Sequence, residues 1–336
     1  SWETATTLNA GLDFGLFSNR LTGSIDYFDT RTTDLLTDIS LSGIGGYTNT
    51  ITNGGETRNH GIEILLSGNI IRNKNFNWNV TTAFTSYRNE IVKTGVTGVA
   101  GEQKNDIGRG RYVGTPINNI RTYVFDGIFQ TDADAINSAQ GSLGGTITPF
   151  QNVATLLAGA IRLKDVNGDG RINDDDQVIF ATDPKWFSSI STTVSYKSFD
   201  LLADLYFVEG TMKINPYLSS FNEGGTLQSV RNGIKVDYWT PENPSNTFPR
   251  PNHSAAPANV SSLGLRESSY VRLRTLSLGY NMQNSLLDKM KLSGLRVYIT
   301  ASNLFTITDY KSYSPENNPN QFPDTKSFTF GLDIGL

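Results

Sequence analysis

The sequence of 336 residues contains no cysteine, so disulfide bonds, thiolate metal sites and cysteine nucleophiles are all excluded. It has no run of about 18 apolar residues, which excludes a membrane-spanning helix. A formal net charge of −4 provides no basic surface of the kind that binds nucleic acid. The two histidines, His60 and His253, lie far apart in the chain and read as polar loop residues rather than as metal ligands or catalytic groups.

Motifs for catalysis are missing as well. No G-x-S-x-G elbow occurs with a histidine partner, and there is no P-loop or dinucleotide-binding fingerprint. Paired acids such as Asp132 and Asp134 could serve a glycosidase, but they lie in a polar segment where nothing keeps a carboxyl protonated at neutral pH. We therefore do not expect an enzyme.

What the sequence does contain is the period-two pattern of strands. From Leu8 to Leu16 every second residue is apolar and the residues between them are polar or glycine, and the pattern recurs at 76–84, 199–207 and 328–336. The segment 270–281 is the least regular, because Arg272 and Arg274 interrupt its faces. The sequence predicts an all-β, antiparallel fold. Further strands are expected at 21–35, 61–71, 186–196, 270–281 and 295–305.

Short and long connections alternate along the chain. Turns of a few residues are expected near Asn19, Lys74 and Lys197, with a somewhat longer one at 284–293. This layout is typical of an outer-membrane β-barrel, in which short periplasmic turns oppose long extracellular loops. A soluble β-sandwich is the alternative, although its strands are usually shorter. The long loops are expected near 37–58, 93–185, 210–268 and 308–326.

The number of expected strands is nine, and complete single-chain bacterial barrels have an even number. No signal peptide opens the chain. We therefore expect part of the barrel to lie upstream of Ser1.

Blocks of sequence along the chain carry a family resemblance. They read WETATTLNAGLDFGLFSNRLTGSIDYFDTRTTDLL, TNGGETRNHGIEILLSGNI, GIFQ, KDVNGDGRINDDDQ, DPKWFSSISTTVSYKSFDL, SSYVRLRTLSLGYNM and LRVYITASNLFTITDYKSYSPE. Together they resemble the C-terminal part of the SusC/RagA family of TonB-dependent outer-membrane transporters. One difference is the last residue, Leu336, where the family usually ends in an aromatic residue.

The resemblance implies a barrel of about 22 strands closed by a plug domain, with this chain supplying the last nine. The plug and the N-terminal strands would lie outside residues 1–336. It also implies import of a large nutrient, an oligosaccharide or an oligopeptide, across the outer membrane. The expected partners are the TonB complex, the outer-membrane lipid and a SusD-like surface lipoprotein that covers the extracellular loops.

The segment KDVNGDGRINDDDQ matches the spacing of an EF-hand calcium loop, with Gly170 at the position of the sharp bend. Aspartate stands at the closing position instead of the usual glutamate. An Asx-turn-rich loop without an ion is the alternative, because tight turns select the same residues. A bound calcium ion would stiffen a long loop. The candidate ligands are Asp165, Asn167, Asp169, the carbonyl of Arg171, Asn173 and Asp176.

Aromatic residues in the long loops are candidates for contact with substrate or lid. They are Tyr217, Phe221, Tyr238 and Trp239, and each of them could instead pack one loop against another. Two other functions stay open: a soluble or surface-attached calcium-binding adhesin, and an outer-membrane barrel with a scaffold or secretion-associated role.

Overall fold

The computed structural model describes residues 2–40, 49–97, 101–140, 157–219, 237–250, 259–282, 287, 291–317 and 321–335. The chain divides into two compact units. We call Ser1–Asn118, Asp183–Thr211 and Ser268–Leu336 the wall unit, and Asn119–Thr182 and Met212–Glu267 the loop unit. Within the described ranges, no helix has the length and apolar character needed to cross a membrane.

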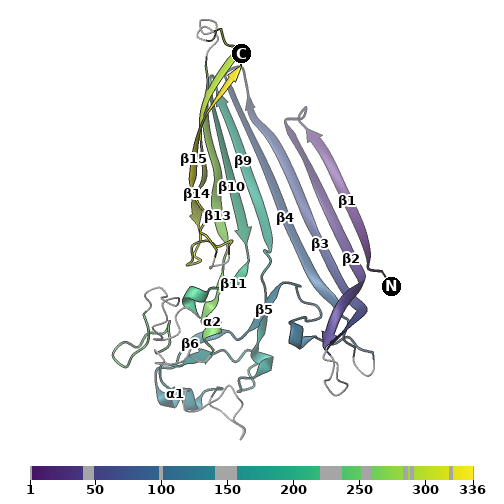
Figure 1. The fold of residues 1–336 in the computed structure, drawn as a ribbon, viewed down its shortest axis with the longest axis vertical. Helices are drawn as coiled ribbons and strands as arrows, with labels where there is room; N and C mark the ends of the chain where they lie inside the picture. Colours follow the sequence, from purple (N-terminus) through teal and green to yellow (C-terminus); the bar gives the residue numbers. More distant parts are fainter. Residues whose placement is uncertain are drawn as a thin grey trace. The chain divides into compact units, whose positions relative to one another are not determined.

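The wall unit is a nine-stranded antiparallel sheet in which strands consecutive in this unit are neighbours (Figure 1). Nine strands match the number expected from the sequence, and the sheet is open. Its strands, in order across the sheet, are β1 (Thr4–Leu16), β2 (Leu21–Ser40), β3 (Asn49–Arg72), β4 (Phe76–Thr94), β9 (Trp186–Tyr196), β10 (Phe199–Glu209), β13 (Tyr270–Asn281), β14 (Gly294–Ile307) and β15 (Ser327–Gly335).

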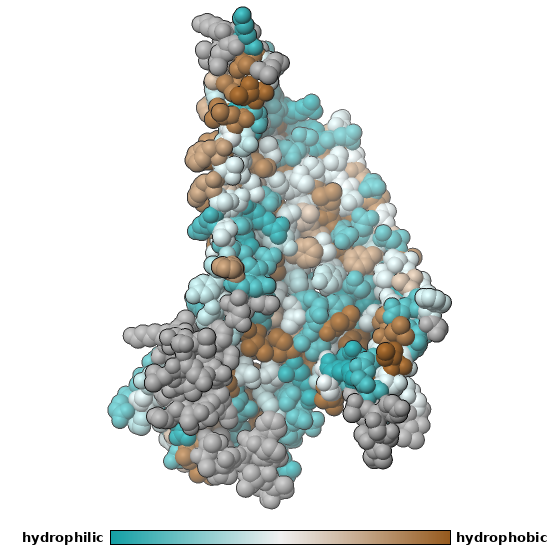
Figure 2. Space-filling model, viewed as in Figure 1, coloured by the Kyte–Doolittle hydropathy of each residue, from teal (hydrophilic) through white to brown (hydrophobic). Residues whose placement is uncertain are grey.

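The pairing register gives the sheet one apolar and one polar face. Direct cross-strand partners share a face, and one such row joins Val194, Leu201, Leu278, Ile299 and Phe330 across five strands. We call this side the apolar face and the opposite side the polar face. Figure 2 shows apolar residues lined up along the β14–β15 side of the sheet. The exposed ones on β15 are Phe328, Phe330, Leu332 and Ile334.

The short turns lie where the sequence predicts them. Phe17, Ser18 and Asn19 adopt left-handed conformations between β1 and β2, and Lys197 does so between β9 and β10. Between β3 and β4, the Asn73 side chain accepts hydrogen bonds from two backbone amides that follow it. All of these turns close hairpins at the same end of the sheet.

The segment 37–58 differs from the loop that the sequence suggests, because most of it is strand. Thr37 pairs with Thr52, so β2 and β3 continue as a hairpin well beyond their apolar stretch. Glu56 of β3, only 2% exposed, stabilises this extension by ion pairs with Arg31 of β2 and Lys93 of β4. A buried carboxylate is favourable only when paired. Polar residues therefore support these strands through ion pairs as well as backbone hydrogen bonds.

The loop unit has a hydrophobic core of its own. It contains three two-stranded ladders, β5 (Asn119–Thr122) with β8 (Val178–Ala181), β6 (Phe125–Ile128) with β7 (Ile161–Leu163), and β11 (Met212–Ile214) with β12 (Leu265–Glu267), together with the short helices α1 (Asp132–Asn137) and α2 (Val260–Gly264). The predicted loops 93–185 and 210–268 thus include folded structure. The buried core residues are Tyr123, Ile128, Ile161, Leu163, Ile172, Trp239 and Leu263.

Candidate functional site

The polar face of the wall unit carries a row of aromatic rings. Tyr87 of β4, Phe187 of β9, Tyr206 of β10 and Tyr270 of β13 contact one another in that order, with ring centroids 6.5, 6.4 and 6.2 Å apart. The contacts are diagonal, since each ring lies one pleat away from the direct partner of its neighbour. We call these four residues the aromatic row.

Glycine lets the rings extend towards β2. Gly61 lies directly between Phe28 and Tyr87 in the register. A Cβ at Gly61 would come within 2.9 Å of the Phe28 ring and 2.8 Å of the Tyr87 Cβ. A larger residue would therefore push these two aromatic side chains apart.

A β-bulge places an extra arginine beside the aromatic row. Arg274 has no direct partner in β10 or in β14, and the register shifts at this residue on both sides of β13. Bulges turn a side chain away from its regular direction. The Arg274 guanidinium carbon lies 3.3 Å from the centroid of the Tyr206 ring, which is a cation–π contact. Within the described part of the chain, no carboxylate forms an ion pair with Arg274.

The guanidinium of the neighbouring Arg272 donates hydrogen bonds to three other side chains of this protein. Arg272 is 5% exposed and donates to Glu316 at 2.8 Å, to Asp324 at 2.5 Å and to the hydroxyl of Thr306 at 3.1 Å. Both carboxylates come from the segment that joins β14 to β15. Arg272 therefore fastens that segment to β13 beside Tyr270, whose side chain is buried in consequence.

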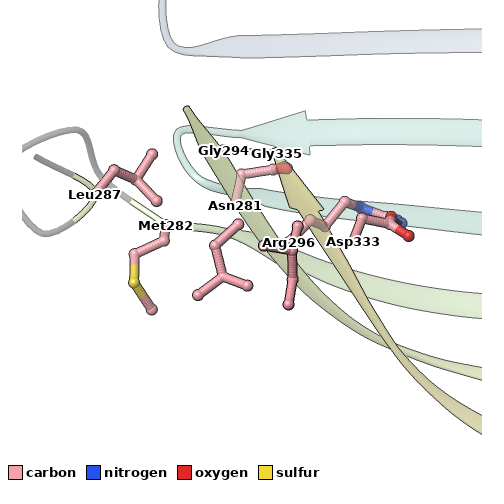
Figure 3. A pocket seen from close by; sticks show the side chains of 9 residues that line it. Asn281, Met282, Leu287, Gly294, Arg296, Asp333 and Gly335 are labelled. Carbon is pink, nitrogen blue, oxygen red and sulfur yellow. Dashed lines mark hydrogen bonds and ion pairs between the residues drawn. The ribbon is translucent and has the colours of Figure 1, made fainter. Parts of the chain in front are cut away.

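A second polar cluster lies on the same face near the short turns. Arg296 pairs with Asp200 at 2.7 Å and with Asp333 at 3.4 Å. Gly279 lies beneath the Arg296–Asp200 pair, where a Cβ would come within 2.6 Å of both side chains. Arg296 and Asp333 line an open pocket of about 350 Å³, with Met282 among its other lining residues. Figure 3 shows these side chains.

The predicted calcium loop is held by bonds between its side chains and its own backbone. The Asp165 carboxylate accepts hydrogen bonds from the amides of Gly168 and Gly170 at 2.7 and 2.8 Å. Asp169 accepts one from the amide of Arg171 at 2.8 Å. The bond between Asp169 and Arg171 has the spacing of an Asx turn, and together these bonds set the course of the loop backbone.

Two further candidate ligands of this loop cap the start of a short 3₁₀ helix. Asn173 and Asp176 form a reciprocal capping box around residues 174–176, and Asp176 is fully buried. The second Asp176 oxygen accepts from the amide of Val166 at 2.9 Å. Across the described ranges, no three His, Asp or Glu side chains are placed to hold a metal ion together. Asn167 is exposed, and its side chain accepts from the amide of Asp169.

The aromatic loop residues fall into different environments. Trp239 is 8% exposed, packs in the core of the loop unit and donates its indole N–H to Gln130 at 3.0 Å, so its ring is not presented to a ligand. Tyr238 is 46% exposed. Tyr217 is half-buried in a short 3₁₀ helix, Pro216–Leu218. Phe221 lies outside the described residues.

Sequence reasoning missed the aromatic row and the role of Arg274. The four rings come from four strands, and only the register brings them together. The available signal was the irregular alternation at Arg272 and Arg274, which is what a bulge and a buried ion pair produce in a strand sequence. His60 lies on β3 and is not part of either polar cluster.

Comparison with known proteins shows what the chain is similar to. Residues 1–304 match the family model described as TonB dependent receptor-like, beta-barrel. TonB-dependent receptor P3 of Formosa agariphila is 29% identical over 99% of the chain and 34% of its own length. TonB-dependent receptor SusC of Bacteroides thetaiotaomicron is 26% identical over 99% of the chain and 32% of its own length.

Solved structures give the same result for the fold. The RagAB peptide transporter matches 100% of the chain and 36% of its own chain, with a TM-score of 0.75 and 26% identity. The RagAB peptide importer in the "open-open" state matches with a TM-score of 0.74 and 25% identity. The chain thus spans about a third of the length of the relatives it matches.

Proposed function

The chain belongs to the TonB-dependent receptor-like β-barrel family, and from this premise we propose that it forms part of a transporter that imports a large nutrient across the outer membrane. The family is one of outer-membrane receptors for TonB-driven transport and not of enzymes. The observation that carries the proposal is the two-faced sheet: an apolar face suits contact with lipid, and a polar face suits the inside of a barrel.

The strand lengths support a membrane-spanning wall. The shortest strand of the sheet has 9 residues and β9 has 11. Tilted strands of about 9–11 residues cross the hydrocarbon core of a bilayer. We propose that the remaining strands of a barrel of about 22, and the plug that closes it, come from the rest of the protein.

The substrate we propose is an oligosaccharide or an oligopeptide. A relative named TonB-dependent receptor SusC and a structural neighbour described as the RagAB peptide transporter support this proposal. We propose a SusD-like surface lipoprotein as the partner, with contacts to the loop unit. Tyr238, which is 46% exposed, is available for such a contact, and Tyr217 is a second candidate.

Uptake measured in cells tests the function. Cells that carry the protein should accumulate labelled oligopeptides or oligosaccharides, and accumulation should stop when TonB is deleted. Import that is unchanged without TonB, or absent for both substrate classes, would contradict the proposal.

Two further observations separate the alternative functions. An outer-membrane barrel should require detergent for extraction and should migrate differently on unheated and heated gels. An adhesin with the same strands would extract in buffer alone. A barrel with only a scaffold role would pass the first test and show no TonB-dependent uptake.

A further inference from the structure

The aromatic row and Arg274 together have the features of a ligand subsite on the polar face. Three of the rings, Tyr87, Phe187 and Tyr206, are half-buried and lie on the surface of the sheet. Tyr270 is 6% exposed and is closed off by the Arg272 network. The accessible part of the row therefore runs from Tyr206 across β9 to β4.

The spacing of the rings fits an extended peptide. Side chains on the same side of an extended chain repeat about every 6.6–6.8 Å, twice the rise per residue. The centroids of Tyr87, Phe187 and Tyr206 are separated by 6.5 and 6.4 Å. Alternate side chains of an extended peptide can therefore lie over successive rings. Five residues cover the three accessible rings.

The charges give the peptide a direction. Arg274 keeps a guanidinium beside Tyr206 with which no described carboxylate forms an ion pair. On the same strand as Arg274, and directly opposite Tyr206, Arg272 pairs with both Glu316 and Asp324, so that cluster has an excess of negative charge. A carboxylate is attracted to Arg274 and repelled from the Arg272 cluster. A peptide should therefore end at Arg274 and extend towards Tyr87.

We propose that the aromatic row and Arg274 bind an extended oligopeptide whose C-terminal carboxylate pairs with Arg274 and whose alternate apolar side chains cover Tyr206, Phe187 and Tyr87. This inference rests on the proposed import function and selects the peptide class among its substrates. The planar guanidinium suits two-point contact with a carboxylate while its face stays on the tyrosine ring.

Binding of two matched peptides to the purified complete protein tests the proposal. Leu-Ser-Leu-Ser-Leu with a free C-terminus and the same peptide with a C-terminal amide differ only in the carboxylate. The free acid should bind about tenfold to a hundredfold more tightly, since hydrogen bonds to charged groups contribute about 1.5–3 kcal/mol. Arg274→Gln should remove most of that difference, and Arg274→Lys should restore part of it.

Control variants separate this subsite from a general loss of fold. Arg88→Gln removes an exposed arginine from the apolar face of β4 and should leave both affinities unchanged. Phe187→Ala should weaken the acid and the amide equally. Equal binding of acid and amide to the unchanged protein, or an undiminished preference for the acid in Arg274→Gln, would overturn the proposal.

The outcome for the subsite is distinct from the outcome for transport. TonB-dependent peptide uptake that is insensitive to Arg274→Gln refutes the subsite and leaves the import function standing. Uptake of oligosaccharides with no binding of either peptide refutes the peptide class. Absence of all TonB-dependent uptake refutes the import function itself, whatever the peptide affinities are.

Discussion

An arginine placed on either face of β9 should have very different effects on stability. Ile190 and Ser191 are adjacent near the middle of this 11-residue strand. Ile190 lies on the apolar face, where it pairs with Thr82 and Leu205, whereas Ser191 lies on the polar face opposite Asp204. The variants Ile190→Arg and Ser191→Arg therefore introduce the same charge at nearly the same depth but on opposite sides of the sheet.

The geometry of β9 determines the expected magnitude. Ser191 is the central residue, and Ile190 is one residue away, about 3.3 Å along a strand tilted by about 35–45°. When the centre of β9 is taken as the membrane midplane, both positions lie within about 3 Å of it. An arginine facing lipid there costs about 2–4 kcal/mol. An arginine at Ser191 faces the interior and lies opposite Asp204, so its effect should stay within about 1 kcal/mol of zero.

Unfolding of the complete protein from phospholipid vesicles by guanidinium measures both variants. The fraction folded is read as the heat-modifiable band on unheated gels. Ile190→Arg should lower the free energy of unfolding by about 2–4 kcal/mol relative to Ser191→Arg. Equal losses, or a larger loss for Ser191→Arg, would refute the assignment of the two faces to lipid and to the barrel interior.

Three more predictions concern the segments between the wall strands. Arg272→Met should make the β14–β15 connection more sensitive to protease in the folded barrel, with a loss of about 1–3 kcal/mol because its carboxylate partners are partly exposed; unchanged cleavage would contradict this. Calcium binding by the loop 165–176 stays a prediction. Replacing Asp165 and Asp169 with Asn should remove the bound calcium that elemental analysis measures in the unchanged protein. The same calcium content in both proteins would refute the hypothesis. Burial raises the pKa of Tyr123 above its usual 10.0. As pH rises past about 10, the unfolded chain loses this proton before the folded chain does, so the stability of the loop unit should fall. Tyr123→Phe should flatten that fall, and a variant with the same pH profile as the unchanged protein would contradict this role of Tyr123.

Strand positions could be predicted from the sequence because the two faces of each wall strand lie in different environments. A strand with lipid on one side and water on the other must alternate, and the alternation is visible in a single sequence. The expected ranges 186–196 and 270–281 coincide with β9 and β13. The extension of β2 and β3 could not be predicted in this way, because the alternation of apolar and polar residues ends before it.

The candidate site depended on information that a single strand does not carry. Whether Tyr87, Phe187 and Tyr206 meet is decided by the register between strands, which the hairpin turns and the bulge set. The burial of Trp239 could not be predicted from the sequence either. The core of the loop unit is built from short ladders, and these are too short to give a regular alternation of apolar and polar residues. The calcium motif differs from both: its spacing is clear in the sequence, two of its carboxylates accept hydrogen bonds from backbone amides in the structure, and the bound ion stays a prediction.

The bulge at Arg274 also determines which single-residue deletions β13 can tolerate. Deleting most single residues of β13 would exchange the faces of everything beyond the deletion, turning apolar side chains inward. Arg274 is the exception, because Leu273 and Thr275 already lie on opposite faces and their partners in β10 are consecutive residues. Loss of this one codon would restore one-to-one pairing with β10, while Asn303 and Leu304 of β14 would still lack partners in β13. A single deletion would therefore remove the guanidinium and keep the two faces of β13, but it would leave a two-residue bulge in β14.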